Sequence, residues 1–193
     1  NIFGGFNNFA NGNNGTDNIT VFYGDSVTGV YKGAGGRFLG GEDTDIMSVE
    51  NGNIFRINGN NGDDLIIGNS GRYFFDNGTY QRSFGEFRGG AGNDVLAVDN
   101  GYVYGDRGSD TFIVRPPTAL LNEYAYVVDY TPSVDKLMYS TEYGFLQFVP
   151  ESVEGITGLS VFQQGVRSMF LAGISSYLEV TPIGDNQTVS LFA

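Results

Sequence analysis

The chain has 193 residues, and 30 of them are glycine, about twice the usual share. Its formal net charge is −12 at pH 7 with only ten Lys and Arg residues, so we expect no nucleic-acid partner. It contains no Cys and no His, which excludes disulfides, zinc thiolate sites and the commonest general base. No apolar run is long enough to span a membrane.

A nine-residue pattern of glycine and aspartate recurs along the first part of the chain. It is complete at residues 89–97, where Gly occupies positions one, two and four, Asp94 position six and Leu96 position eight. Four further segments keep most of the pattern, and each has an apolar residue two places after its aspartate. They are residues 12–20 with Asp17, 40–48 with Asp45, 59–67 with Asp64 and 105–113 with Asp110. Such repetition at fixed offsets is typical of a solenoid.

The residue types of this pattern suit a hard cation. Glycine at positions one, two and four permits positive φ, so the loop can curl and aim its carbonyl oxygens at one point. The aspartate adds charge. Ca²⁺ takes about six to eight oxygen ligands, more than one short loop supplies, whereas two stacked loops supply enough. Each repeat therefore predicts half a coil, in which an ion-binding turn leads into a strand that fills the core.

Short apolar strands precede the loops, as at residues 36–40, 85–89 and 101–105, and tight turns at 50–52 and 99–101 lie between coils. We therefore expect each coil to have one ion-binding side and one plain side.

The loop aspartates are 28, 19, 30 and 16 residues apart along the chain. Spacings of 19 and 16 match one coil, which predicts that Asp45 stacks on Asp64 and that Asp94 stacks on Asp110. The spacings of 28 and 30 leave two alternatives: an intervening coil without ion ligands, or a motif that changes sides.

The repeat pattern stops at Arg115, Pro116 and Pro117, because proline cannot continue a paired central strand. We place a boundary there, with a Ca²⁺-binding roll over residues 1–115 and a capping and secretion region over residues 116–193. Several short apolar runs predict strands in the second region, with a short helix near residues 174–179. A solenoid needs such a cap over its last exposed core.

The five nonapeptides resemble those of the RTX, or hemolysin-type, family of glycine-rich Ca²⁺-binding repeats in secreted bacterial proteins. Residues 127–137 are similar to the segment that follows the repeats in this family, and residues 170–174 and 189–193 resemble its C-terminal secretion signal. The resemblance implies an all-β fold: a right-handed parallel β-roll or β-helix solenoid with Ca²⁺-binding turns and a β-rich C-terminal cap.

The resemblance also implies ligands for two or more Ca²⁺ ions. In the family, carbonyls at positions one and three and the Asp of one loop meet carbonyls at positions two and four and the Asp of the next. Carried over, Gly89, Ala91 and Asp94 pair with Asp106, Gly108 and Asp110. Likewise Gly40, Glu42 and Asp45 pair with Asn60, Gly62 and Asp64, and Asp17 is a further expected ligand.

Some loop positions depart from the family pattern. Asp43 replaces the fourth-position glycine, while Asn13, Asn60 and Asp106 replace the second. Asn and Asp tolerate left-handed conformations better than other non-glycine residues, so we expect these loops to keep their shape.

The function implied is a module that folds on binding Ca²⁺ after export, as the C-terminal folding and secretion domain of a larger secreted protein. Its partner would be the type I secretion machinery, its location extracellular or at the cell surface, and its state monomeric or part of a larger chain. The first residues, already coil-like and without an initiating Met, suggest a fragment of such a protein.

Two alternatives remain open. One is an adhesin-like or epimerase-module-like domain that binds surface polysaccharide, with Arg72, Arg82 and Arg88 and the aromatic residues of 73–87 as its face; a solvated face and core packing are the simpler interpretation. The other is a β-helix lyase or epimerase. With no His and two Lys, we expect no catalytic residue and no enzyme. Asp129 and Asp135 are either ligands or turn caps.

Overall fold

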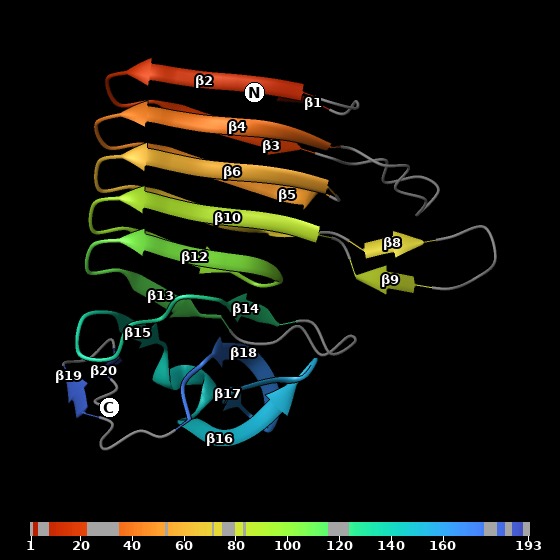
Figure 1. The fold of residues 1–193 in the computed structure, drawn as a ribbon, viewed down its shortest axis with the longest axis vertical. Coiled ribbons are helices and arrows are strands. Elements are labelled where there is room, and N and C mark those ends of the chain that lie inside the picture. Colours follow the sequence, from red (N-terminus) through yellow and green to blue (C-terminus); the bar gives the residue numbers. More distant parts are fainter. Residues whose placement is uncertain are drawn as a thin grey trace.

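The computed structural model describes residues 2–3, 8–22, 35–52, 54–70, 72–74, 80–82, 84–115, 124–175, 181–183 and 187–190. Within these ranges the chain is all β, with no α-helix and one 3₁₀ turn, η1 (Thr141–Tyr143). Two nine-stranded sheets run the length of the molecule, and the successive coils form a tall stack that ends in a curved cap (Figure 1).

One sheet, here the β2 sheet, collects the strands that precede the aspartate loops. Its order, from the N-terminal end of the stack, is β2 (Asn8–Asn14), β4 (Gly35–Glu42), β6 (Ile54–Asn61), β10 (Phe84–Ala91), β12 (Gly101–Arg107), β14 (Ala125–Val127), β18 (Val166–Ala172), β17 (Ile156–Gln163) and β16 (Leu146–Val153).

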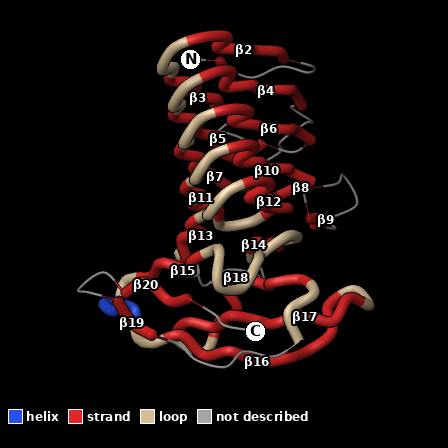
Figure 2. Tube along the Cα trace, turned by 60° about the vertical axis from the view of Figure 1, so that its left-hand side comes forward, coloured by secondary structure: helices blue, strands red, loops and turns tan. Residues whose placement is uncertain are grey.

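The other sheet, the β3 sheet, collects the strands that follow the loops. Its order is β1 (Ile2–Phe3), β3 (Asn18–Phe22), β5 (Ile46–Gly52), β7 (Leu65–Ser70), β11 (Val95–Val98), β13 (Thr111–Val114), β15 (Lys136–Tyr139), β20 (Gln187–Ser190) and β19 (Thr181–Ile183). Each coil therefore contributes one strand to each sheet, joined by an aspartate loop along one edge of the stack (Figure 2).

Strand pairing is parallel throughout the stack and antiparallel in most of the cap. Parallel pairing runs from β2 to β14 in one sheet and from β1 to β15 in the other. It thus continues beyond residue 115, because β14 and β15 add one more coil. Antiparallel pairs then join β16, β17 and β18, and β15, β20 and β19. The fold is an all-β, parallel solenoid-like structure, as the sequence predicts.

Neither alternative for the long spacings is correct. β2 pairs directly with β4 and β6 directly with β10, so no coil intervenes and the motif stays on one side. In the second spacing, the additional residues include a two-stranded antiparallel hairpin, β8 (Arg72–Phe74) and β9 (Tyr80–Arg82), which projects from the edge opposite the loops (Figure 1). The residues around position 30 in the first spacing lie outside the described ranges, as does most of the helix predicted near residues 174–179.

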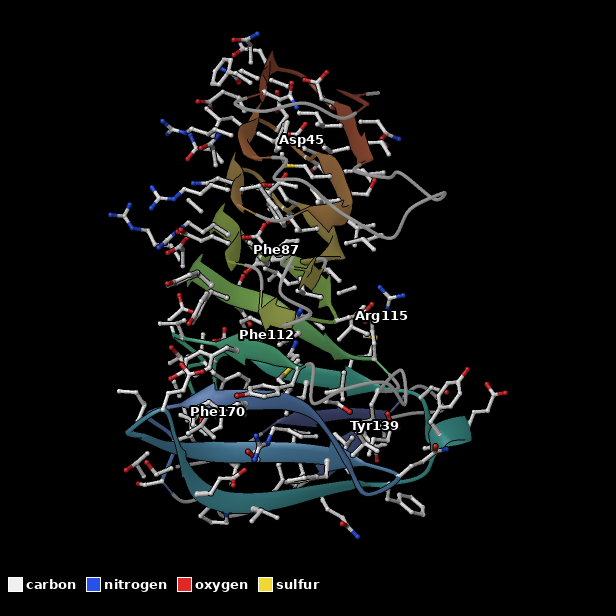
Figure 3. All side chains as sticks on the ribbon, turned by 90° about the vertical axis from the view of Figure 1, so that its right-hand side faces the viewer. Asp45, Phe87, Phe112, Arg115, Tyr139 and Phe170 are labelled. Carbon is white, nitrogen blue, oxygen red and sulfur yellow. The ribbon has the colours of Figure 1, made fainter. Side chains whose placement is uncertain are left out.

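The core lies between the two sheets and follows the period of two that strands impose. Phe87 lies on β10, the strand that leads into the complete repeat. It is fully buried and packs edge-on against Phe55 with ring centroids 5.1 Å apart. Phe112, on β13 of the next coil, belongs to the same buried cluster (Figure 3). Residues two places after each loop aspartate also point inward, as predicted: Met47, Ile66, Leu96 and Phe112 are at most 1% exposed, and Ile19 is partly buried.

No helix in the described part of the chain is long and apolar enough to cross a membrane.

The packing predicts a large difference between two phenylalanines of the β2 sheet. Phe87→Ala should lower the free energy of unfolding by about 3–5 kcal/mol, because it leaves a cavity between close-packed sheets. Phe9, which is 64% exposed, is the matched control. Phe9→Ala should change the free energy of unfolding by less than about 0.5 kcal/mol. Urea unfolding followed by circular dichroism in one buffer measures both. Equal losses in the two variants would contradict this core.

Candidate metal centre

The loops owe their curl to left-handed residues at positions two and four. In the complete repeat, Gly90 has φ 118° and Gly92 has φ 151°. Where the sequence departs from glycine, the same conformation persists, which confirms the expectation for these substitutions: φ is 71° at Asn13, 74° at Asp43, 75° at Asn60 and 66° at Asp106. All five loops therefore share one backbone shape.

The first glycine of each loop serves a different purpose from the one expected. None of these glycines has a positive φ. Instead, a Cβ on Gly40 would collide with the carboxylate of Asp45 and with the carbonyl oxygen of Gly59 in the next coil. The expectation that glycine at position one is needed for a positive φ is therefore wrong. Glycine is needed there because the aspartate side chain at position six folds back over it and leaves no room for a Cβ.

The loop aspartates form a continuous hydrogen-bonded column, the aspartate ladder. The backbone N–H of each donates to Oδ1 of the aspartate in the next coil. The distances are 2.8 Å from Asp17 to Asp45, 2.7 Å from Asp45 to Asp64, 2.8 Å from Asp64 to Asp94 and 2.9 Å from Asp94 to Asp110. The predicted stacking of Asp45 on Asp64 and of Asp94 on Asp110 is confirmed. The same bond also joins the pairs spaced by 28 and 30 residues.

The second carboxylate oxygen in this ladder has no donor. Oδ2 of Asp17, Asp45, Asp64 and Asp94 is buried and makes no hydrogen bond. Each of the first three shares the space above its loop's first glycine with a carbonyl oxygen of the next coil, contributed by Gly40, Gly59 and Gly89 in turn. A buried anionic oxygen beside a buried carbonyl oxygen is unfavourable unless a proton or a cation lies between them.

The ladder ends on two aspartates that lie outside the repeats. Asp110 donates its N–H to Oδ1 of Asp135 at 2.9 Å, and Oδ2 of Asp135 accepts from the N–H of Thr131 at 2.7 Å. Asp129 accepts from the N–H groups of Gly105 and Asp106, each at 3.0 Å. These carboxylates are satisfied by backbone donors, so both residues cap the last loop, which is the turn-cap interpretation of the two left open.

A second column of hydrogen bonds runs along the exposed side of the loops. Here each N–H donates to the preceding coil, whereas in the aspartate ladder it donates to the next one. The N–H of Asn93 donates to Oδ1 of Asp63 in the preceding coil at 2.7 Å, and the N–H of Ser109 donates to Oδ1 of Asn93 at 3.0 Å. Sequence reasoning missed these fifth-position residues. The signal was partial, because the fifth position is Asp63 and Asn93 in two successive loops and Thr or Ser in the other three.

Burial raises the pKa of the ladder carboxyls from Asp45 to Asp110 and that of Asp135. Desolvation is the largest cause at each of these residues, and repulsion from neighbouring carboxylates adds to it. It raises the pKa of Asp64 to about 6 and those of Asp94 and Asp110 to about 7, and it also raises the pKa of Asp45 and Asp135. The backbone N–H donors oppose these shifts without cancelling them. At neutral pH the ladder is therefore poised between protonation and binding of a cation.

The direction of the carbonyls differs from the ligand pairing that the family resemblance implies. The resemblance pairs Gly89 and Ala91 with the following loop, but their carbonyls face the preceding one, where the carbonyl of Ala91 accepts from the N–H of Gly62 at 2.9 Å. The carbonyls of Asn60 and Gly62 point forward, toward Gly90 and Gly92. The space between two loops is thus lined by carbonyls two and four of the first loop and one and three of the second.

With this pairing of loops, the predicted ligand residues lie beside different aspartates from those that the resemblance implies. Between the loops at 59–67 and 89–97 lie the carbonyls of Asn60, Gly62, Gly89 and Ala91 and the donorless oxygen of Asp64. The carbonyl of Gly40 faces the loop of Asp17 in the same way. Asp45 and Asp64 remain neighbours, but Asn60 and Gly62 line the next space along.

These residues fit Ca²⁺ in kind. All are hard oxygen donors, partly anionic and already desolvated, as Ca²⁺ requires. Among the residues that the structure describes, no group of three or more His, Cys, Asp or Glu side chains converges on one point. An ion would therefore take one or two carboxylates and complete its shell with backbone carbonyls. Glu42 does not join such a shell through its side chain, which accepts from the Asn61 amide at 3.0 Å on the exposed side.

Comparison with models of known protein families gives no match for this chain, and comparison with curated proteins gives no significant match.

The raised pKa values predict an inverted pH dependence without cations. A carboxyl whose pKa is higher when folded than when unfolded stabilises the fold fully below its unfolded pKa near 3.8, and this contribution is lost as pH rises through its folded pKa. With chelator, stability should therefore fall between about pH 4 and pH 7, on the order of several kcal/mol, since each pKa unit corresponds to about 1.4 kcal/mol. Circular dichroism of the chelated protein at pH 5 and pH 8 measures the effect, and the larger folded fraction is expected at pH 5. A chelated protein that is more stable at pH 8 would contradict it.

Proposed function

We propose that this chain is a Ca²⁺-binding parallel β-roll of the RTX type, which folds on binding calcium as the C-terminal folding and secretion module of a larger secreted protein. The observation that supports this most directly is the column of buried carboxylate oxygens without donors. Four such oxygens, one per loop from Asp17 to Asp94, are stacked on one edge beside inward-facing carbonyls. The described loops have no arginine or lysine side chain that neutralises them.

Calcium suits this column better than other common cations. The chain has no Cys and no His, which removes the ligands that soft and borderline metals prefer. Mg²⁺ demands near-ideal octahedral geometry and keeps several waters, whereas Ca²⁺ accepts irregular shells of carbonyl and carboxylate oxygens. When bound, the ion would supply the positive charge that the ladder lacks. The chain's own contribution is to hold the oxygens in place through the N–H to Oδ1 bonds.

The burial of the segment similar to a secretion signal supports folding after export. Phe170 and Leu171 belong to that segment, and both are fully buried in β18, which joins the stack through β14. A transporter could contact these side chains only before the cap forms. Low cytosolic Ca²⁺ would leave the ladder carboxylates unscreened and the chain extended, and the higher concentration outside the cell would fold it.

No observation at the residues named for polysaccharide binding supports that alternative, and none supports a lyase or epimerase. The side chains of Arg72 and Tyr73 lie outside the described part of the chain, and Phe87 is a core residue. Arg88 lies on β10 of the stack instead of in the hairpin and forms ion pairs with Glu86 and Asp106.

Metal analysis with circular dichroism tests the proposal. Purified protein at pH 8 should carry up to four Ca²⁺ ions, one for each donorless oxygen, and lose its β signal on chelation. Each site adds about 2.7 kcal/mol of stability when free Ca²⁺ is a hundredfold above its dissociation constant. Readdition of Ca²⁺ should restore the fold and Mg²⁺ should not. An unchanged spectrum and melting temperature after chelation would refute the proposal.

Two adjacent aspartates give a charge-matched comparison. Asp64→Asn keeps an oxygen to accept the N–H of Asp45 but removes a buried charge, so bound Ca²⁺ should fall by at least one ion and the midpoint of calcium-induced folding should rise about tenfold or more. Asp63→Asn makes the same charge change at an exposed residue that keeps its bond from Asn93, and it should leave both unchanged. Calorimetric titration measures stoichiometry and midpoint. Equal effects of the two variants would show that calcium binding does not depend on the buried ladder carboxylate.

A further inference from the structure

The face of the β3 sheet that points away from the core, here the β3 face, is apolar along most of the stack. Side chains along a strand point to opposite sides in turn, so residues of this face alternate with core residues. Ile66 and Leu96 are fully buried core residues. The residues on either side of them belong to neither buried cluster, as do their counterparts on β5 and β13. These outward apolar residues are Ile46, Leu65, Ile67, Val95, Ala97 and Ile113.

Strand register aligns the outward side chains in two rows that run along the stack. The first row is, in order, Asn18, Ile46, Leu65, Val95, Thr111 and Lys136. The second row is, in order, Thr20, Ser48, Ile67, Ala97, Ile113 and Met138. Neighbours within a row are about 4.8 Å apart, the distance between paired strands. The two rows together form one apolar strip across six strands.

The two sheets differ in their outward residues. In the β2 sheet, apolar core residues alternate with charged ones, as where Phe87 lies between Glu86 and Arg88. Strands of the β3 sheet are apolar without interruption, as at residues 65–67 (Leu-Ile-Ile) and 95–98 (Val-Leu-Ala-Val). Continuous apolar strands are typical of parallel sheets that are covered on both faces. The core covers one face of this sheet, so its sequence suits a second covering layer on the β3 face.

The charge of the chain favours the β3 face for contact between two copies. With 22 Asp and Glu residues against ten Lys and Arg, two copies repel each other over most of their surface. The two rows contain no carboxylate, and Lys136 is their only charged residue. Two copies can therefore meet at this face without burying a negative charge, which would be strongly unfavourable.

The shape of the stack also suits contact between two sheets. Successive coils lie almost directly above one another (Figure 2). Flat sheets of many strands are unusual and are typically stabilised by stacking. Six strands about 4.8 Å apart, with about four residues each, give an outline of about 400 Å² per copy, below the roughly 800 Å² of a standard interface. We therefore expect a contact that dissociates in the micromolar range.

We propose that two copies of this chain associate through their β3 faces, with antiparallel stack axes, about a two-fold axis that runs along the strands between β7 and β11. Such an axis keeps each row opposite the same row of the second copy and reverses its order. Ile67 then lies opposite Ala97 of the second copy, and Ser48 opposite Ile113. A large side chain meets a small one at both positions, as closely packed layers require.

This dimer goes beyond the proposed calcium-dependent folding, and it requires only that the stack is folded. The ladder carboxylates lie along the edge where the loops join the two sheets, whereas the rows lie on a sheet face and share no residue with the ladder. A chain that stays monomeric while it keeps its β signal would refute the dimer alone. A β signal that survives chelation would refute the calcium proposal alone, so the two failures are distinguishable.

Sedimentation equilibrium of the whole chain in calcium buffer, from about 1 to 500 μM, tests the dimer. The parent should change from monomer to dimer over this range. Ile67→Glu should raise the dissociation constant at least about a hundredfold, because it places two unpaired charges in the contact. Leu39→Glu is the matched control, since Leu39 is a half-buried outward residue of the β2 sheet, and it should leave the dissociation constant unchanged. Circular dichroism confirms that both variants keep the β signal.

An exchange of side-chain size tests the two-fold register. Ala97→Ile should weaken the dimer about tenfold, because its new side chain meets Ile67 of the second copy. Adding Ile67→Ala to this variant should restore the parent's dissociation constant, since each large side chain again meets a small one. The proposal is overturned if the parent is monomeric at the highest concentration, if Leu39→Glu weakens the dimer as much as Ile67→Glu, or if the exchange restores nothing.

Discussion

The bond from each aspartate N–H to Oδ1 of the next aspartate determines most of what is unusual in this chain. It fixes the vertical alignment of the loops and holds one oxygen of each carboxylate, which forces the other oxygen inward over the first glycine. A side chain at that position would displace the carboxylate. Burying a row of like charges is strongly unfavourable by itself, so the same bond that builds the column also makes it depend on a counter-charge.

The end of the column shows how the chain closes it without a further ion-binding loop. Asp135 supplies the acceptor for Asp110 and is itself held by Thr131, while Asp129 satisfies two N–H groups that strand pairing no longer reaches. Backbone donors thus replace what a cation would do in the coils above. In a solenoid, coils interact mainly with their neighbours, so these residues link the aspartate ladder to a cap that continues the main apolar core and adds a small second cluster.

The sequence was sufficient for the parts of the fold that follow from local repetition. The inward residues such as Met47 and Leu96, the stacking of Asp45 on Asp64 and the left-handed Asp43 all follow from fixed offsets within a nonapeptide. The spacings of 28 and 30 could not be resolved, because an excursion at the plain edge and an added coil lengthen the chain equally. The directions of the loop carbonyls could not be predicted from the sequence either, because they depend on how one loop faces the next and not on residue type.

The need for a counter-charge grows with the length of the stack. The pairing of β4 with β6 brings the loops of Asp45 and Asp64 into register, and each further coil adds one buried carboxylate to the ladder. Like charges buried side by side raise each other's pKa, as Asp45 does for Asp64, so each added coil makes the ladder more dependent on a proton or a cation. A cation that binds the folded ladder and not the unfolded chain would stabilise the folded state by mass action, and its apparent affinity would rise with the fraction of chain that is folded.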